Sequence, residues 1–260
     1  MKLAPNSSLG PYIVNCLSGV GSSAEVYRCQ DTVHGREVAL KILQPENGQL
    51  DERMAADFHR QALILGSVRH PNIVEVYDSG IEQGVQYIAF EFLDGKPLRG
   101  PFPAPEIALI AAQIAAAITT LHNAGITHND LKPKNLILTN GGHVKLIDFG
   151  IARQLTPEMR ADPQQLSEWH KCVRVDQLSF GLSLYELAIG KGPFEDRRTA
   201  NTLSQLLTSQ MLPLPPEAQL SMQEALRHCA AADSGNAGLL LTAMSVALSL
   251  AGAPLPQPEI

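Results

Sequence analysis

The chain has 260 residues, of which 45% are hydrophobic and 18% charged, and its formal net charge is −6. This composition is typical of a globular protein and argues against a disordered or fibrous chain, and the length suits one large domain or two smaller lobes. The negative charge argues against a general nucleic-acid-binding protein, because neutralising nucleic-acid phosphates requires a basic face.

The four cysteines lie far apart and form no C-x-x-C pair or other metal-ligand spacing. They predict reduced thiols in a cytosolic protein. The first residues contain no apolar stretch of the signal-peptide kind. The most apolar window, residues 238–253, is shorter than the roughly 20 residues that span a bilayer and predicts a buried helix. We therefore expect a cytoplasmic protein without a membrane span, with delivery to another cell or compartment as the open alternative.

The first third of the chain predicts mostly strands. Residues 12–17 and 25–29 flank a Gly/Ser turn and predict a hairpin, and residues 37–43 predict a third strand. Apolar residues at helical spacing then predict a helix over residues 51–68. Two further strands are expected over residues 73–77 and 85–92, separated by a turn at Ser79 and Gly80.

The rest of the chain predicts mostly helices. A stripe of apolar residues predicts a helix over residues 106–124. Residues 136–138 and 144–147 flank a tight Asn-Gly-Gly turn and predict a short strand pair, and a further helix is expected over residues 178–189. We therefore predict an α+β fold, with a small β-rich N-terminal lobe (residues 1–93), a larger helical C-terminal lobe (residues 94–260) and a cleft between them, which together form one domain.

A Gly/Ser-rich turn, Gly19-Val20-Gly21-Ser22-Ser23-Ala24-Glu25-Val26, joins the first two predicted strands. Glycines allow backbone N–H groups to approach a phosphate without an intervening Cβ, although such turns are also common in ordinary hairpins. One strand later, Val38-Ala39-Leu40-Lys41 carries a lysine that could contact the same phosphate. Alone, Lys41 would be interpreted as a solvated edge residue, and its position one strand after the turn favours the functional interpretation.

The segment His128-Asn129-Asp130-Leu131-Lys132-Pro133-Lys134-Asn135 follows a predicted helix. Asp130 can orient an acceptor hydroxyl and accept its proton, and Lys132 can neutralise charge on a transferred phosphoryl group. Asn135 offers a neutral oxygen to a hard cation. Thirteen positions later (148 − 135), across the predicted strand pair, stands Asp148-Phe149-Gly150, so Asn135 and Asp148 are expected to meet at one metal site.

In this order the four motifs resemble a Hanks-type, bacterial serine/threonine protein kinase domain, over roughly residues 12–194. Residues 70–74, His-Pro-Asn-Ile-Val, resemble the family's link from its C-helix to its fourth strand, and residues 88–93 resemble its hinge. The resemblance implies transfer of the γ-phosphoryl group of ATP to a Ser or Thr hydroxyl of a protein substrate, with Mg²⁺, or Mn²⁺ in its place. It implies no oligomeric state.

The resemblance also implies a set of site residues. Asp130 and Lys132 would be catalytic, and Asn135 and Asp148 would hold the metal. The residues in support would be Gln61, a packed His128, Phe149, and Asp176 as the anchor of the catalytic loop. The nucleotide would contact Gly19, Val20, Gly21, Ser22, Ser23, Val26, Ala39, Lys41, Phe90 as gatekeeper, and the hinge backbone of Glu91 and Leu93.

Two departures from the family pattern lie in the predicted N-terminal lobe. Ala24 replaces the third glycine of the phosphate-binding turn. Gln61 occupies the C-helix position where the family has a Glu that pairs with the strand lysine, here Lys41. Because a charge-assisted hydrogen bond is about twice as strong as a neutral one, we expect a slower enzyme and not an inactive one.

Two further departures concern activation and substrate docking. Asn129 replaces the Arg that receives a phosphate in family members switched by activation-loop phosphorylation, so we expect that this protein is not switched in that way. The interval from Asp148 to Asp176 spans only 28 positions (176 − 148) and has no Ala-Pro-Glu, which predicts a shortened activation segment. Residues 95–105 also look trimmed, so that most of the helix after the hinge would be missing.

Two alternative functions remain open from the sequence. A small-molecule kinase of the aminoglycoside phosphotransferase type shares the His-x-Asp and the following Asn, but would not be expected to carry the Val-Ala-x-Lys, His-Pro-Asn-Ile-Val and Asp-Phe-Gly set together. A non-catalytic nucleotide-binding scaffold would explain Ala24, Gln61 and the short segment, but not the retention of Asp130 and Asp148.

Overall fold

The computed structural model describes residues 2–21, 23–44 and 52–190. Ser22, the end of the resemblance at residues 192–194 and the helix predicted over residues 238–253 lie outside the described residues. The chain divides into two compact units. Unit 1 comprises Met1–Asp94 and Phe149–Ala152, unit 2 comprises Gly95–Asp148 and Arg153–Ile260, and each is described by itself.

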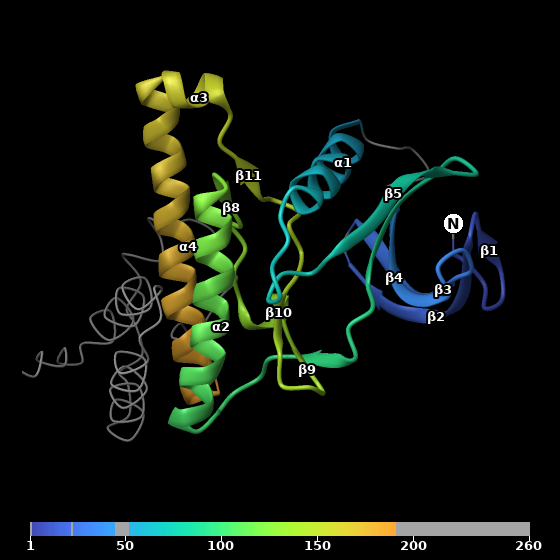
Figure 1. Cartoon of the computed structure of the whole chain (residues 1–260), viewed down its shortest axis with the longest axis horizontal. Helices are drawn as coiled ribbons and strands as arrows, with labels where there is room; N and C mark the ends of the chain where they lie inside the picture. The colour runs from blue at the N-terminus through green and yellow to red at the C-terminus, as the bar shows by residue number, and fades with distance from the viewer. Residues whose placement is uncertain (1, 22, 45–51, 191–260) are drawn as a thin grey trace, which may run out of the picture. The chain divides into compact units, whose positions relative to one another are not determined.

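Unit 1 is built on one antiparallel sheet with the strand order β1-β2-β3-β4-β6-β5 (Figure 1). The strands alternate between core-facing and outward-facing residues, as expected for a sheet with one buried face. One helix, α1, packs beside β5. Their bounds are β1 (Ser8–Leu9), β2 (Tyr12–Val20), β3 (Ala24–Asp31), β4 (Arg36–Leu43), α1 (Glu52–Gly66), β5 (Val76–Glu82) and β6 (Val85–Glu91).

The position of one predicted strand was wrong. We expected residues 73–77, followed by a turn at Ser79 and Gly80, but β5 runs through both residues and the hairpin turns at Gln83 and Gly84. These two have φ values of 52° and 78°, the left-handed conformation that tight two-residue hairpins require. Gly80 lies opposite Tyr87, and a Cβ there would stand 3.2 Å from the Tyr87 hydroxyl. Gly80 therefore makes room for a ring and does not form a turn.

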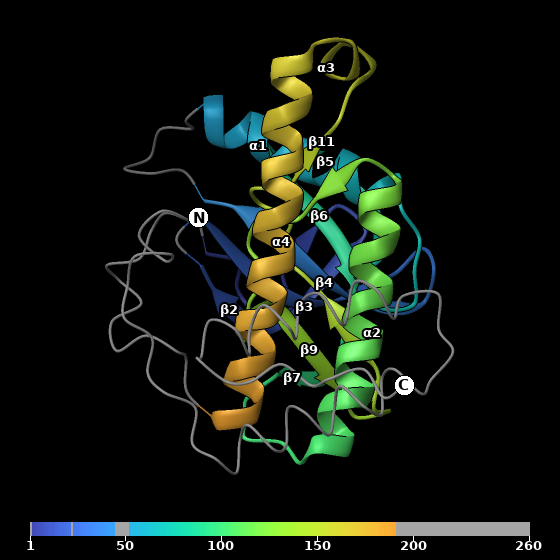
Figure 2. The ribbon, with the colours of Figure 1, turned by 90° about the vertical axis from the view of Figure 1, so that its left-hand side faces the viewer.

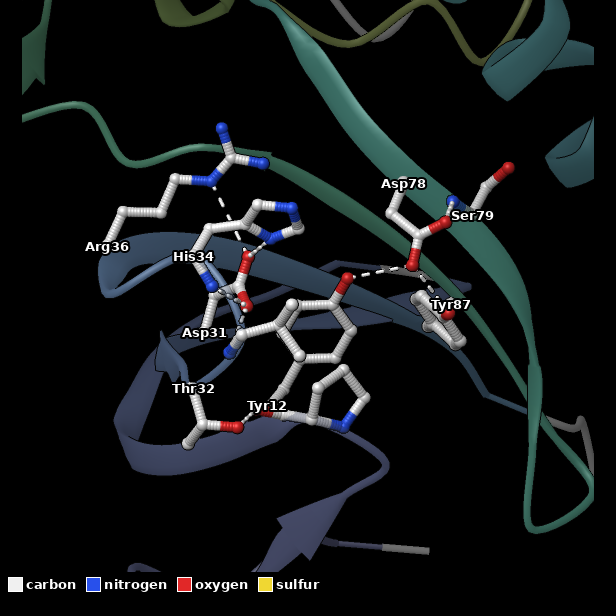
Figure 3. A network of polar contacts seen from close by, with 10 residues as sticks. Tyr12, Asp31, Thr32, His34, Arg36, Asp78, Ser79 and Tyr87 are labelled. Atoms are coloured by element: carbon white, nitrogen blue, oxygen red, sulfur yellow. Dashed lines mark hydrogen bonds and ion pairs between the residues drawn. The ribbon is translucent and has the colours of Figure 1, made fainter.

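The sheet of unit 1 curls until β2 meets β5, although three strands separate them in the sheet order (Figure 3). The hydroxyls of Tyr12 in β2 and Tyr87 in β6 each donate a hydrogen bond of 2.8 Å to Oδ2 of Asp78 in β5. The two rings lie edge to face with centroids 5.4 Å apart. The curled sheet encloses a buried core of Leu9, Tyr12, Val14, Tyr27, Cys29, Val38, Leu40, Ile42, Tyr87 and Ala89.

Unit 2 is built on two long helices, α2 (Ala104–Asn123) and α4 (Pro163–Ile189), which lie side by side and antiparallel (Figure 2). One small sheet has the order β10-β9-β7, and a second pairs β11 with β8. The predicted helix over residues 106–124 and the predicted strand pair are confirmed. The remaining elements are β7 (Gly95–Pro97), β8 (Ile126–Thr127), the 3₁₀ turn η1 (Pro133–Asn135), β9 (Leu136–Thr139), β10 (Val144–Leu146), β11 (Arg153–Gln154) and α3 (Pro157–Ala161).

Helix α4 begins 15 residues (178 − 163) before the start we predicted. Asp162 caps it, because its Oδ1 accepts the N–H groups of Gln164 at 2.8 Å and Gln165 at 3.2 Å. Pro163 occupies the first turn, where its fixed φ favours a helix. The prediction was wrong because it followed apolar residues, whereas this capping signal precedes a polar stretch. The first turns of α4 extend beyond the end of α2 (Figure 1, Figure 2).

The chain between β7 and α2 packs against the last turns of α4. Residues 98–103, all of them described, form no helix, so none lies between β7 and α2. The N–H of Phe102 donates to the carbonyl oxygen of Leu187 at 2.8 Å. A Cβ on Gly100 would stand 2.4 Å from that oxygen, so only glycine allows this approach. Within the described part of the chain, no helix is both long and apolar enough to cross a membrane.

Candidate active site

Unit 1 places the predicted nucleotide-binding side chains on one face of its sheet. Val26 lies opposite Lys41 in the β3–β4 pair, and Ala39 lies opposite Phe90 in the β4–β6 pair. Residues directly opposite each other in antiparallel strands share a face. This face is the reverse of the one that supplies Tyr27, Leu40 and Ile42 to the core, because side chains alternate along a strand.

The glycine-rich turn follows β2 directly. Gly19 and Val20 end that strand, and the N–H of Gly21 donates to the carbonyl oxygen of Ala24 at 2.8 Å to close the turn. A Cβ on Gly19 would meet no atom within 4 Å. The carbonyl oxygen of Ser23 accepts the N–H of Gln44 at 2.9 Å, which ties the turn to the end of β4.

Of the two hinge residues predicted to contact adenine, Glu91 is the last residue of β6 and Leu93 follows that strand. The N–H of Glu91 donates to the carbonyl oxygen of Glu75 at 2.9 Å, which fixes the start of the hinge. Arg28, which no sequence motif marks, donates hydrogen bonds to Glu37 from two nitrogens at 2.7 and 2.8 Å. Its guanidinium lies 4.6 Å from the ring centroid of Phe92, between Glu91 and Leu93, a cation–π contact. The contact between Arg28 and the hinge could not be predicted from the sequence, because only the fold brings Phe92 close to β3.

The contact expected between Lys41 and Gln61 is present. Nζ of Lys41 donates to Oε1 of Gln61 at 3.1 Å, and Gln61 is only 2% exposed in α1. Because an ammonium group has no acceptor, the amide must turn its oxygen toward the lysine. The amide nitrogen Nε2 is then buried and has no hydrogen-bond acceptor among the described residues. A glutamate at this position would leave no such donor.

Unit 2 brings the three chemical groups of the catalytic loop together. Nζ of Lys132 lies 2.5 and 2.6 Å from the two carboxylate oxygens of Asp130. Nδ2 of Asn135 donates to the carbonyl oxygen of Asp130 at 2.8 Å and to its Oδ2 at 3.0 Å. With Nδ2 fixed on Asp130, the amide oxygen Oδ1 faces away from these bonds, as a cation ligand would.

The two candidate metal ligands are connected through the backbone. The N–H of Ile147, the residue before Asp148, donates to the carbonyl oxygen of Asn135 at 2.9 Å. Asp148 has a φ of 66°, a left-handed conformation that few non-glycine residues other than Asn and Asp adopt, and unusual backbone conformations concentrate at functional sites. Mg²⁺ is typically bound by one or two protein groups together with substrate phosphates and water. One carboxylate and one amide oxygen fit that ion, and the described residues contain no larger cluster of metal ligands.

Asp176 holds the backbone of the catalytic loop. This carboxylate, 1% exposed in α4, accepts the N–H of His128 at 2.8 Å and the N–H of Asn129 at 2.7 Å. Nε2 of His122, at the end of α2, lies 3.0 Å from the same group. The sequence predicts Asp176 as the anchor but gives no sign of His122, because no local pattern distinguishes that histidine from other polar residues at a helix end.

His128 is buried and links three parts of the site. Its Nδ1 accepts the N–H of Asp130 at 3.2 Å, so its Nε2 carries the proton and donates to the carbonyl oxygen of Ile147 at 3.1 Å. Burial lowers the pKa of His128, although the nearby carboxylates of Asp176, Asp130 and Asp148 act in the opposite direction. The ring is therefore neutral, and it connects the loop to the strand end that precedes Asp148.

Comparison with known proteins identifies the family. The protein kinase domain family matches residues 12–236. The chain is 32% identical over 240 residues to a probable serine/threonine-protein kinase PknB of Lactococcus lactis (84% of this chain, 38% of that protein). It is 33% identical over 204 residues to the serine/threonine-protein kinase PrkC of Bacillus subtilis (72% and 31%), and 35% identical over 208 residues to a probable serine/threonine-protein kinase PknB of Corynebacterium glutamicum (71% and 32%). The chain thus spans about a third of the length of these relatives. It belongs to the protein kinase domain family, which confirms the resemblance and the predicted α+β fold class.

Proposed function

We propose that the chain is an ATP- and Mg²⁺-dependent kinase that phosphorylates Ser or Thr residues of proteins. The observation that carries this proposal is the Asp130–Lys132–Asn135 cluster, which Asp176 holds through the backbone of the same loop. The relatives are named serine/threonine-protein kinases, which favours a protein acceptor over a small molecule.

Each residue of the cluster has one step to perform. The Asp130 carboxylate orients the acceptor hydroxyl and accepts its proton as the hydroxyl oxygen forms a bond to the γ-phosphorus. The bond from that phosphorus to the bridging oxygen of ADP breaks in the same transfer. Lys132, 2.5 Å from Asp130, offsets the negative charge on the transferred group. Asn135 and Asp148 would hold Mg²⁺, which supplies positive charge to the phosphates.

The nucleotide itself would bind to unit 1. Lys41 would contact its phosphates, and the backbone of the turn from Gly19 to Ser23 would cover them. Val26 and Ala39 share the face of Lys41 and would pack against the base. The proposed hinge contacts are the backbone groups of Glu91 and Leu93, beside the Phe90 gatekeeper.

The proposed enzyme is not switched by phosphorylation of its activation segment. Asn129, a neutral side chain, stands where switched family members carry a phosphate-binding arginine. The proposed location is the cytoplasm, which the cysteines favour, since Cys16, Cys29 and Cys172 all have free thiols.

Transfer of labelled phosphate separates this proposal from its alternatives. The protein and its Asp130→Asn variant are incubated with γ-labelled ATP and Mg²⁺, alone and with a cell lysate. Label on Ser or Thr of proteins in the wild type only supports the proposal. Label on small molecules only would indicate a small-molecule kinase. Thermal stabilisation by ATP without any transfer would indicate the nucleotide-binding scaffold, which the neutral Gln61 favours.

A further inference from the structure

The backbone of Asn129 adopts a conformation that few residues tolerate. Its φ is 63°, in the left-handed region that costs most L-residues roughly 1–2 kcal/mol but is reached readily by Gly and Asn. In this conformation its N–H points at Asp176 and donates a hydrogen bond of 2.7 Å to Oδ1. The identity of residue 129 therefore matters for the shape of the catalytic loop.

The side chain of Asn129 makes a second connection. Its Nδ2 donates to Oγ1 of Thr127 at 3.1 Å, and Thr127 is fully buried. Thr127 belongs to β8, the strand that immediately precedes the catalytic loop. The amide thus ties the loop back to the strand from which the loop emerges.

Strand β8 also holds the segment that follows Asp-Phe-Gly. Thr127 pairs with Arg153 and Ile126 with Gln154 in the β8–β11 pair. The N–H of Leu155 donates to the carbonyl oxygen of Gly125 at 2.7 Å. Residues 153–155 are therefore docked by backbone hydrogen bonds, and the strand on which they dock is the one that Asn129 holds.

We infer that Asn129 is a positioning residue that couples the docked segment, residues 153–155, to the catalytic loop. A phosphorylated residue bound by an arginine would order such a segment through added charge. Here a neutral amide, a buried hydroxyl and a backbone ladder connect the same two parts without a phosphate. This inference rests on the proposed function, because it concerns the regulation of that site.

This coupling differs from an arginine–phosphate ion pair in its response to salt. Neutral hydrogen bonds are little affected by salt, whereas exposed ion pairs are screened over about 10 Å at 0.1 M ionic strength. The docked segment should therefore keep its amide protection when the ionic strength rises. Amide hydrogen exchange at Leu155 reports this directly, since its N–H is the docking donor.

Two variants separate the backbone role of Asn129 from its side-chain role. Asn129→Gly keeps the left-handed backbone and removes the amide, and Thr127→Val keeps the shape of the buried residue and removes the hydroxyl. Each should lower kcat about fivefold, the value of one ordinary hydrogen bond, and leave the KM for ATP unchanged. The exchange of the Leu155 amide should accelerate by a similar factor. The losses of the two single variants should not multiply in the double variant, because both remove the bond between Asn129 and Thr127.

Wild-type kcat and wild-type exchange in Asn129→Gly would overturn the inference. So would losses that multiply in the double variant, since they would show two independent effects. A failure of the proposed function can be distinguished from a failure of this inference. If the wild type transfers no phosphate, that proposal fails, while the exchange of the Leu155 amide in the same variants still decides whether Asn129 holds the docked segment.

Discussion

Lys41 donates a hydrogen bond of 3.1 Å to the side-chain oxygen of Gln61, at the position where the family pattern has a charged glutamate. Gln61 thus retains the contact that orients the lysine but lacks the negative charge of the glutamate. The buried Nε2 of Gln61 is also left without an acceptor in the described part of the chain. A buried donor without a partner costs about 1–3 kcal/mol, so Gln61 lowers the stability of the fold at this position.

The variant Gln61→Glu should be a faster enzyme than the wild type. A carboxylate makes a charge-assisted bond to Lys41 and has no donor to leave unsatisfied. We expect kcat to rise by about tenfold, equivalent to about 1.4 kcal/mol, and the melting temperature to rise with it. Steady-state kinetics at saturating ATP measure the effect. Gln61→Met, of similar size and with no oxygen to accept the bond, serves as the control and should lower kcat. An unchanged or lower kcat in Gln61→Glu would refute this account of the pair.

The Tyr12–Asp78–Tyr87 contact should stabilise unit 1 until strongly alkaline pH. Burial, together with the hydrogen bond to Asp78, raises the pKa of Tyr87 to about 12, above the value of about 10 for an unfolded chain. The folded state therefore retains a proton that the unfolded state loses. The contribution of Tyr87 is fully present below pH 10 and is lost as the pH rises toward 12. Urea unfolding of Tyr87→Phe should show about 1 kcal/mol less stability at pH 7 and a smaller decline between pH 10 and 12. A decline as steep as that of the wild type would contradict this assignment.

His128 should make the protein sensitive to mild acid. Burial lowers the pKa of His128 below its usual value, so the unfolded state binds a proton that the folded state does not. Stability is then fully present above about pH 6.5 and falls as the pH drops below it, by up to about 1.4 kcal/mol per pH unit. Protonation would also place a donor at Nδ1, where the ring now accepts the N–H of Asp130. Denaturant unfolding between pH 7 and 5 should show a slope that His128→Asn removes. Equal slopes in the two proteins would assign the acid sensitivity to other groups.

The close approach of Gly100 to α4 predicts a strongly destabilising substitution. A Cβ at this position would stand 2.4 Å from the carbonyl oxygen of Leu187, a backbone atom that cannot swing aside. Gly100→Ala should reduce the free energy of unfolding by about 1–3 kcal/mol. Gly66→Ala is the matched control, because a Cβ there meets no atom within 4 Å and alanine favours the end of α1. Thermal unfolding of both variants compares them, and similar melting temperatures would argue against a tight packing of this segment.

The order of strands and helices followed from local patterns, and the errors occurred where tertiary contacts decide. Gly80 was predicted to be a turn because glycine often is one, but it faces the Tyr87 ring from a neighbouring strand. The actual turn at Gln83 and Gly84 depends on backbone conformation that Gln does not signal. The start of α4 could have been predicted from Asp162 and Pro163, which together form a capping signal.

The chemistry of the site was predictable to the extent that it is encoded in short motifs. Asp130, Lys132 and Asn135 lie within six positions of one another, and the structure brings all three together. His122, Thr127 and Arg28 were not predictable, because each acts on a residue that only the fold places beside it. The sequence showed that Asn129 replaces an arginine of the family pattern, whereas the hydrogen bonds that Asn129 itself makes became evident only from the structure.

The central claim, that this chain is a working protein kinase, is tested most directly by the rate of phosphate transfer in Asp130→Asn. Asparagine keeps the shape of Asp130 but cannot accept the hydroxyl proton. The account predicts a fall in kcat of about 10²–10⁴-fold, with the dissociation constant for ATP changed little, because Asp130 is not among the proposed contacts to the nucleotide or to Mg²⁺. Equal transfer rates in the variant and the wild type would contradict it.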